Sequence, residues 1–473
     1  MSAFQNKIEF ISNYIKKHNE LISSNIVKLD VYEGNLTPYV IATMKATLSE
    51  NYFAKIESRI IPINVLTRVM DKMSKVYINA PNRLSKEQEW VDAVERSSSI
   101  NMQMGICDTY SQLFKGYLVQ PYVDNREIKL RPIPYDRFLP MAEDIAIPEK
   151  MTGLVVFMGT ITNGSVIEKL FYYYSNTEFI PLAVNGSGNA RVYTPALEGN
   201  EGVNHLGFIP YTYGNRSATT IIPKQDTDIM QITKMIPVML SDLGGAIMFQ
   251  CFSILYGIDV KADNLTMSPN AFWSLKSDST SDKQPQIGTI TPKADIDKVK
   301  GFIKEVFALW LETKGVRVGN VGSVDGGNSA SGISKIIDEM DVFELKKTSI
   351  QYFKKEEKDL WGKLVKLNNV WSKDKLIDTK IIPDDTEVTI IFDEPSPEIA
   401  RKDQVDVAVI ELNNKLKDKK TIITQLNPDL SEQEIEAMIL LIENETPLPP
   451  IALVAEDKEI ESTKNDDQDT KGL

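Results

Sequence analysis

The chain reads GVRVGNVGSVDGGNSASGISKIIDEMDVFELKKTSIQYFKKEEKDLWGKLVKL over residues 315–367, and this stretch changes character once. Residues 315–332 hold six glycines in eighteen positions with small polar side chains, a composition that loses much backbone entropy when it orders. The residues that follow place apolar side chains three or four apart on one stripe, as an amphipathic helix does. We predict a mobile loop and then a helix of about 35 residues, roughly 50 Å long.

Two more helices are predicted before this loop. Residues 225–256 are mostly apolar and contain Pro237 and Gly244-Gly245, where a kink is expected. Helical spacing returns over residues 296–314. Between them lies a polar segment with short strand-like pieces at residues 258–261, 271–276 and 286–290. The sequence therefore predicts two helices divided by a small β insertion.

The N-terminal half combines helices with a β module. Residues 7–77 and 90–117 have mostly helical spacing of apolar residues. Between residues 127 and 213 the period becomes two, with strand-like runs at 154–157, 170–174 and 208–213. Asn163-Gly164 and Asn185-Gly186 suit tight hairpins, because both residue types tolerate positive φ. We predict an antiparallel β module beside a group of helices.

The C-terminal part is predicted to hold a strand at 387–392 and two helices at 398–417 and 431–445. Ser431 and Glu434 have the spacing of a capping box at the start of the second helix. The last twenty residues carry seven acids against three bases without periodicity, so we expect disorder there. The fold class is α+β, mainly helical, and 473 residues suggest several domains.

Composition limits the function. The formal net charge of -13 and a pI near 5.0 argue against a broad basic surface that grips nucleic acid. Two cysteines without a CxxC pair fit a reducing compartment. The first ten residues lack a signal-peptide pattern. Residues 236–258 are long enough to span a bilayer but contain Asp242 and Gln250, so we expect a helix buried inside protein.

The sequence offers little catalytic chemistry. Only two histidines occur, and the glycine-rich stretch lacks both Gly-Lys-Ser/Thr and GxGxxG. Ser329 and Ser331 do not match the GxSxG elbow, and Ser331 is better interpreted as a helix N-cap. Paired acids lack metal-ligand spacing. We therefore expect no enzyme, no cofactor and no metal.

Several short stretches, and above all the order of the parts, resemble the portal protein of tailed bacteriophages. The stretches are Tyr32-Glu33-Gly34, the run Arg59-Ile60-Ile61-Pro62-Ile63-Asn64, Lys75-Val76-Tyr77, and Asn204-His205-Leu206-Gly207-Phe208-Ile209-Pro210-Tyr211 closing with Asn215. The resemblance covers about residues 30–445.

The resemblance implies a portal-like division of the chain. Its parts would be a wing at residues 1–222, a first stem helix at 223–257, a clip at 258–294, a second stem helix at 295–315, a tunnel loop at 316–331, a long crossing helix with a wing strand at 332–395, a helical crown at 396–445 and an acidic tail at 446–473.

The resemblance also implies a structural role in the virion. Such a ring, generally of twelve subunits, lies at the capsid portal vertex, and double-stranded DNA is packaged and ejected through it. It would be synthesised in the bacterial cytoplasm and would not hydrolyse ATP. Its expected partners are the terminase large subunit, head-completion or adaptor proteins, and the major capsid and scaffold proteins, with no membrane.

The residues expected to meet DNA are those of the tunnel loop and basic residues near it. The loop residues are Val318, Gly319, Asn320, Val321, Gly322, Ser323, Val324, Asp325, Gly326, Gly327 and Asn328. The basic residues are Lys298, Lys300, Lys304 and Arg317, although exposed helix lysines are often merely solvated. Within the clip, partner docking would involve Trp273, Lys276 and Lys283.

Other hypotheses remain open from the sequence. Another head-to-tail connector or adaptor ring would share the acidity and the ring assembly. A hydrolase acting through carboxylates would need perturbed Asp or Glu residues gathered in a deep cleft. A membrane-bound protein would need the apolar segment at 236–258 to span a bilayer.

Overall fold

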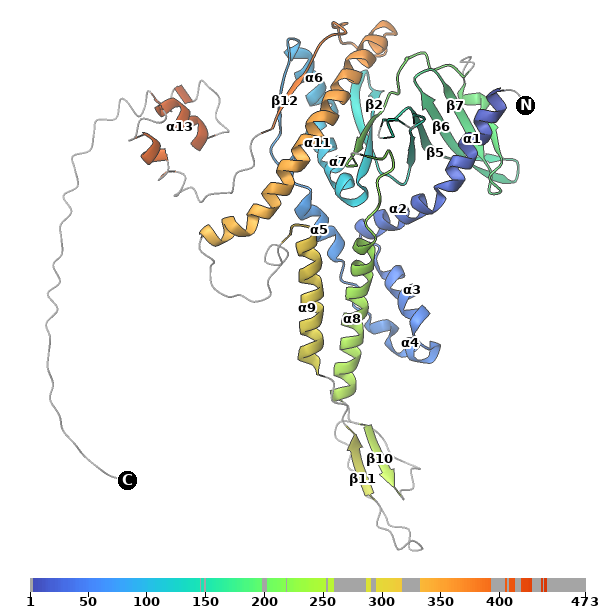
Figure 1. Cartoon of the computed structure of the whole chain (residues 1–473), viewed down its shortest axis with the longest axis vertical. Helices are drawn as coiled ribbons and strands as arrows, with labels where there is room; N and C mark the ends of the chain where they lie inside the picture. Colours follow the sequence, from blue (N-terminus) through green and yellow to red (C-terminus); the bar gives the residue numbers. More distant parts are fainter. Residues whose placement is uncertain are drawn as a thin grey trace, which may run out of the picture. The chain divides into compact units, whose positions relative to one another are not determined.

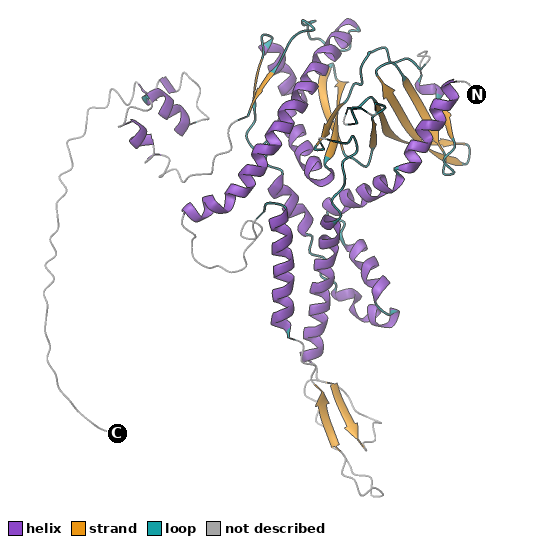
Figure 2. Cartoon of the chain, in the orientation of Figure 1, coloured by secondary structure: helices purple, strands orange, loops and turns teal. Residues whose placement is uncertain are grey.

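The computed structural model of the chain falls into two units, residues 1–397 and residues 398–473. It describes residues 3–144, 146–148, 150–197, 202–217, 219–251, 254–258, 286–290, 295–316 and 332–392 of the first unit. In the second unit it describes residues 405, 408–412, 418–427, 435–436 and 438–439. The described chain mixes helices with antiparallel sheets (Figures 1 and 2), so the coarse α+β prediction is confirmed.

Seven helices form most of the first 114 residues among those described. They are α1 (Ala3–Lys17), α2 (Asn19–Tyr32), α3 (Thr37–Thr47), α4 (Glu50–Ile56), α5 (Val65–Met73), α6 (Gln88–Ser98) and α7 (Ile100–Phe114), with a 3-10 turn η1 (Glu57–Arg59) after α4. Asn64 fixes the start of α5, because its side chain accepts from the Leu66 N–H at 3.0 Å and donates to the Val31 carbonyl at 2.6 Å. The predicted helical stretches are therefore confirmed.

Two antiparallel sheets form the β module. The five-stranded sheet has the order β4-β5-β6-β7-β8, and the three-stranded sheet has the order β3-β2-β9. Their bounds are β2 (Gly116–Asp124), β3 (Glu127–Ile133), β4 (Phe138–Met141), β5 (Gly153–Asn163), β6 (Val166–Ser175), β7 (Phe179–Val184), β8 (Ala190–Val192) and β9 (Thr212–Asn215), with a 3-10 turn η2 (Thr194–Ala196) after β8. Gly164 has φ +62° in the β5–β6 turn, as its hairpin prediction requires.

One predicted strand in this module is wrong in its position. Residues 208–213 were expected to form a strand, but β9 begins only at Thr212. Pro210 has no N–H to donate to a sheet. The segment before it is instead organised by Asn204, whose side-chain amide donates to the carbonyls of Ser175 and Phe208 at 2.7 and 2.9 Å.

The first of the two long apolar helices is shorter than predicted. Helix α8 (Asp228–Cys251) runs through Pro237 without ending. Residues 254–257, which fall within the predicted first stem helix, instead belong to strand β10 (Ile254–Ile258). The sequence Ile-Leu-Tyr-Gly-Ile is rich in residues that favour strands. It pairs antiparallel with β11 (Gln286–Ile290), the strand predicted at 286–290. The predicted first stem helix at 223–257 is corrected accordingly. Of the strand predicted at 258–261, Ile258 lies in β10, and residues 259–261 lie outside the described residues, as does the strand predicted at 271–276.

Residues 236–258 do not form one helix, because α8 ends at Cys251 and β10 begins at Ile254. Among the helices that the structure describes, none is long and apolar enough to cross a membrane. The expectation of a buried helix is only partly right, since Ile236 is buried whereas Ile247 is 40% exposed.

The helices predicted on both sides of the glycine-rich stretch are present. Helix α9 (Ile296–Thr313) matches the prediction at 296–314, and α11 (Gly332–Lys373) is 42 residues long. Helix α11 continues six residues past the predicted end at 367. The predicted strand at 387–392 is reduced to β12 (Thr389–Ile391), which pairs with β1 (Asn82–Leu84).

Helix α11 supplies much of the core of the first unit. Its Phe353 stacks on Tyr117 of β2 at 5.9 Å, and its Trp361 meets the edge of Trp90 of α6 at 5.5 Å. Leu364 is fully buried in the same cluster. Figure 1 shows this helix lying across α6, α7 and β2. The predicted apolar stripe of α11 is therefore the face that packs against the sheet.

The second unit is described only in part. Helix α13 (Lys419–Leu426) lies between the two helices predicted at 398–417 and 431–445 and was not predicted. Ile422 and Ile435 are buried, and Lys420 pairs with Glu436 at 3.0 Å. Most of both predicted crown helices, the Ser431–Glu434 capping box and the tail lie outside the described residues.

Truncation of the α11 stripe should measurably destabilise the first unit. Leu364→Ala removes a fully buried side chain and should cost about 3 kcal/mol of unfolding free energy. The measurement is urea unfolding followed by tryptophan fluorescence. Leu376→Ala, at a half-exposed leucine just beyond the same helix, is the matched control and should change stability by less than about 0.5 kcal/mol. Equal effects of both variants would contradict the described packing.

Candidate functional site

The most distinctive surface of the chain lies on the helix pair α8 and α9, here called the stem. One face of α9 is buried through Ile303, Trp310 and Leu311, with Phe307 packed partly beside them. Trp310 and Leu311 belong to a core cluster that also contains Ile229 of α8, and Phe307 packs against it. The two helices lie side by side in Figures 1 and 2.

A cluster of charges fixes the end of the stem nearest the sheets. Lys314 pairs with Asp226 and Asp228 at 3.0 Å, and Lys115, directly after α7, pairs with Asp226 at 2.6 Å. The Trp310 indole N–H donates to Asp228 at 2.9 Å. Burial alone would raise the pKa of Asp226, but the hydrogen bonds from Lys115 and Lys314 hold this pKa below its ordinary value. The stem is thus tied by polar contacts to the helices and strands before it.

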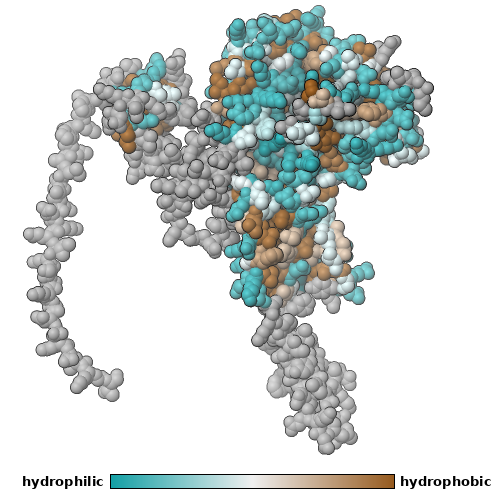
Figure 3. Space-filling view, viewed as in Figure 1, coloured by the Kyte–Doolittle hydropathy of each residue, from teal (hydrophilic) through white to brown (hydrophobic). Residues whose placement is uncertain are grey.

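A second face of α9 is apolar but uncovered. Val299, Phe302, Val306 and Leu309 follow the spacing i, i+3, i+7, i+10, which places them on one stripe of the helix. Phe302 is 54% exposed and Leu309 is 57% exposed. Figure 3 shows hydrophobic residues gathered over this part of the described surface. An apolar stripe of this kind commonly marks an interface with another protein.

The three predicted stem lysines are all exposed on α9, but they do not share one face. Lys300 and Lys304 are one helical turn apart and lie on the same side. Lys298 lies about 120° or more around the helix from both, and it pairs with Asp295 at 2.7 Å. At most two of these lysines can therefore face one channel.

The other predicted site residues lie outside the described part of the chain. This holds for Arg317, for the loop residues 318–328, and for the docking residues Trp273, Lys276 and Lys283. Ser329 and Ser331 lie outside it as well. Their predicted roles stay predictions.

Two adjacent buried acids of α11, Glu356 and Glu357, form a polar site that the sequence analysis missed. Glu356 accepts from the Tyr117 hydroxyl at 2.5 Å and from the Asn215 backbone N–H at 3.0 Å. Burial raises the pKa of Glu356 to about 7, against the opposing effects of Tyr117 and Arg216. This carboxyl therefore joins α11 to both β2 and β9.

The neighbouring Glu357 makes a different set of bonds. Its carboxylate accepts hydrogen bonds from two guanidinium nitrogens of Arg83 of β1, Nε at 2.7 Å and Nη2 at 2.9 Å. It also accepts a hydrogen bond from the Tyr77 hydroxyl at 2.7 Å. Arg83 also donates to Glu95 and Asn101. A signal was present in the sequence, because Glu357 lies four residues after Phe353 and three before Leu360, inside the apolar stripe.

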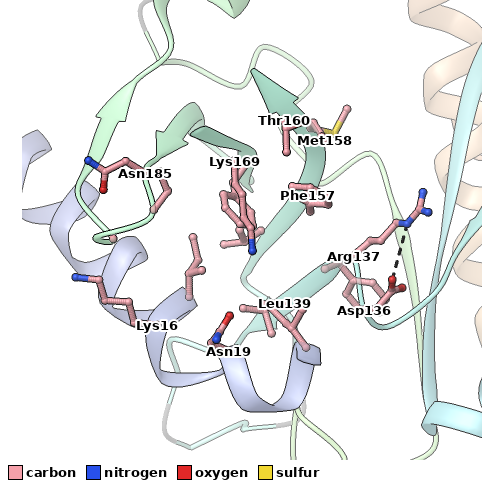
Figure 4. Close-up of a pocket in the computed structure, with 18 of the residues that line it drawn as sticks. Lys16, Asn19, Asp136, Arg137, Leu139, Phe157, Met158, Thr160, Lys169 and Asn185 are labelled. Carbon is pink, nitrogen blue, oxygen red and sulfur yellow. Dashed lines mark ion pairs between the residues drawn. The ribbon is translucent and has the colours of Figure 1, made fainter. Parts of the chain in front are cut away.

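A cavity of about 900 Å³ opens between the N-terminal helices and the five-stranded sheet (Figure 4). Its apolar floor consists of Ile15, Ile22, Leu139, Val155, Phe157 and Phe171. Lys16, Arg137 and Lys169 also line it, and Asp136 is its one acidic lining residue among those described. The Nε atom of Arg137 lies 3.9 Å from Oδ2 of Asp136.

Metal-binding groups, reactive thiols and perturbed acids are the features that bond-breaking chemistry would use. Within the described residues, no group of three His, Cys, Asp or Glu side chains could hold a metal ion. Burial raises the pKa of the Cys107 thiol well above its ordinary value, which disfavours the reactive thiolate. Burial also raises the pKa values of Glu356, Asp108 and Asp136, and of these three only Asp136 lines the cavity.

Comparison with known proteins gives no assignment. The chain matches no protein-family profile, and no curated protein is significantly similar to it.

The buried Glu356 predicts a pH dependence of stability. Its folded-state pKa of about 7 lies above the unfolded value of 4.5, so between these values the folded state binds more protons and stability falls as pH rises. Through Glu356 alone, the wild-type unfolding free energy should drop by on the order of 2–3 kcal/mol from about pH 5 to about pH 7.5. Glu356→Gln should flatten that slope in urea titrations at several pH values.

Asp108 has its pKa raised to about 6 by burial and contributes a slope of the same sign, so the variant should keep a smaller residual slope. Glu305→Gln, at an exposed position on α9, removes one charge elsewhere and serves as the control. A Glu356→Gln profile as steep as that of wild type would contradict the prediction.

Proposed function

We propose that the chain is a portal-type subunit, which forms the ring at the capsid vertex of a tailed bacteriophage through which double-stranded DNA is packaged and ejected. The observation that carries this proposal is the arrangement of α8, the β10–β11 hairpin, α9 and α11 in that order. It matches the order of stem, clip, stem and crossing helix in the family that the sequence resembles. The glycine-rich residues 315–332 fall between α9 and α11, where the tunnel loop would be.

The exposed apolar stripe of α9 supports assembly into a ring. Full burial of a Leu or Phe side chain is worth about 1.5–3 kcal/mol, and this stripe leaves Phe302 and Leu309 mostly in water. The stripe contains no charged residue to oppose its burial. Neighbouring subunits that pack along their stems would cover it.

The charge distribution supports a channel through which DNA slides. The net charge of -13 per chain disfavours tight phosphate binding. Lys300 and Lys304 provide at most a narrow basic strip on one side of α9. The proposed partners are the terminase large subunit, the head-completion or adaptor proteins, and the major capsid and scaffold proteins, with Trp273, Lys276 and Lys283 in the proposed docking hairpin.

The hydrolase alternative receives less support from the described residues. The cavity is lined by one acid, Asp136, whereas hydrolysis through carboxylates uses two. Another connector or adaptor ring remains the nearer alternative. It would be expected to lack a crossing helix as long as α11.

Ring assembly should depend on the α9 stripe. Electron microscopy of the purified protein should show rings with a central hole and rotational symmetry near twelve. The double variant Phe302→Asp/Leu309→Asp should reduce ring particles by more than about tenfold, because two buried carboxylates would cost several kcal/mol per interface. Lys304→Asp, on the opposite side of the same helix, is the matched control and should still form rings. A wild-type monomer with a closed pocket would refute the ring.

The glycine-rich loop should act on DNA transport without acting on assembly. Deletion of residues 320–326 should leave rings intact and lower the yield of packaged DNA in a packaging assay. Lys300→Glu/Lys304→Glu tests the basic strip in the same assay, with Lys298→Glu as the control on another face. Normal packaging by the deletion variant would count strongly against the proposed role of the loop.

A further inference from the structure

The five-stranded sheet has a strand that is only partly paired on one side. Strand β4 pairs with β5 from Met141 opposite Gly153 to Phe138 opposite Val156. The Phe157 N–H donates to the Arg137 carbonyl at 2.7 Å, and within the described chain no further strand continues along this side. Residues 158–163 of β5 pair only with β6. Every second residue of such an edge presents its N–H and C=O outward.

A β-bulge brings this free edge to the cavity. The register of β5 against β6 shifts between Phe157 and Gly159, and Gly159 has φ +132°, a conformation that favours glycine. A bulge bends its strand and increases the local twist. Met158, Gly159 and Thr160, the first residues of the free edge, line the cavity together with Phe157. Figure 4 shows Phe157, Met158 and Thr160 together above Leu139 and Asn19.

The cavity selects for apolar side chains accompanied by negative charge. Its floor is apolar, and three cationic residues line it against the single acid Asp136. Figure 4 shows the Lys169 amine directed into the cavity, while Arg137 is joined to Asp136. Lys169 has no ion pair among the described residues. In a chain of net charge -13, this local cationic excess favours an acidic ligand.

The surroundings of the cavity indicate a polypeptide ligand. Ile26 and Met158 line it and are exposed, and Ile167 is 69% exposed beside them. A small molecule inside the cavity would leave these side chains and the free backbone groups of β5 in water. A peptide strand would cover both, because main-chain hydrogen bonds and alternating side chains act together in such pairing.

We propose that the free edge of β5 and the adjoining cavity form a docking site for an extended segment of another protein. This segment adds as a strand beside residues 158–163, places apolar side chains in the cavity and places an acidic side chain near Lys169. It belongs to a partner that alternates apolar residues with Glu or Asp. The site does not depend on the proposed ring function, since every group in it comes from one chain.

The experiment measures binding of a defined peptide to the full-length protein. The probe is a fluorescein-labelled peptide, Thr-Glu-Val-Glu-Phe-Thr-Val-Glu-Ile-Thr, followed by fluorescence polarisation. Saturable binding below about 1 mM is expected, and replacement of the three Glu by Lys should weaken it by about tenfold or more. Two N-methylated peptides, methylated on alternate amides in opposite registers, test the backbone pairing. One register should lose about tenfold in affinity, and the other should stay within about twofold.

Matched variants locate the binding. Lys169→Glu and Ile167→Asp change exposed side chains at the site, and each should weaken the peptide about fivefold or more. Lys86→Glu and Ile78→Asp, exposed residues that do not line the cavity, should bind as wild type does. The proposal is overturned by no saturable binding, by equal binding of the Lys peptide, or by equal loss in both methylated registers. Self-association blocked by Ile167→Asp, with no binding of the peptide, would assign the edge to a second copy and equally overturn the acidic partner.

Discussion

The architecture of the first unit depends on two adjacent buried carboxylates, Glu356 and Glu357, near the middle of α11. Neighbouring residues of a helix point about 100° apart, so two consecutive anchors in different directions fix both the rotation of the helix and its position along its axis. Glu356 is held by β2 and β9, and Glu357 is held by Arg83 of β1. Apolar packing alone tolerates small slips along a stripe. Two buried acids do not, because each loses its donors when the helix moves.

The position set by these acids extends to the stem through polar contacts. Asn215, which donates to Glu356, ends β9 and lies opposite Gly116 in the register of β2. Lys115 directly precedes Gly116 and pairs with Asp226, which also accepts from Lys314 at the end of α9. Each link is short, and the one at Glu356 is buried, where electrostatic contacts are stronger than at an open surface. The pair of Lys115 and Asp226 is about one-third exposed. The stem therefore continues the sheet and α11, and its exposed apolar stripe is held in a defined place.

The sequence predicted elements with strong local patterns and missed those that depend on contacts distant in the chain. The α11 stripe, the Asn163-Gly164 hairpin and β11 are local signals, and the structure has all three. The boundary at residue 251 was missed because Ile254–Ile258 is apolar enough for a helix, and its pairing with β11 decides the outcome. Strand β1 has three residues and exists through its pairing with β12, some 300 residues later in the chain.

The candidate sites likewise divide into those that follow from local sequence patterns and those that depend on contacts distant in the chain. Exposed lysines on α9 were predictable from helix spacing, although the separate face of Lys298 was recognised only when the helix bounds were known. The carboxylate pair was visible as two acids inside an apolar stripe, but its donors lie on segments that the sequence does not connect. The cavity could not be predicted from the sequence. It arises because β4 pairs with β5 only as far as Val156, whereas β5 continues to Asn163 and is bent by the bulge between Phe157 and Gly159.

The two uncovered surfaces, the apolar stripe of α9 and the free edge of β5, offer different groups for binding and therefore suit different kinds of partner. The α9 stripe lacks charged side chains and offers no free backbone groups, because the hydrogen bonds of a helix are internal. Binding at the α9 stripe can therefore gain free energy only from the burial of apolar area, which suits repeated contacts between identical stems. The β5 edge offers unpaired backbone groups beside Lys16, Arg137 and Lys169, so it gains from directional hydrogen bonds and opposite charge. Such a surface discriminates between ligands by sequence and charge, and discrimination of that kind is needed for a particular partner more than for a ring of equal copies.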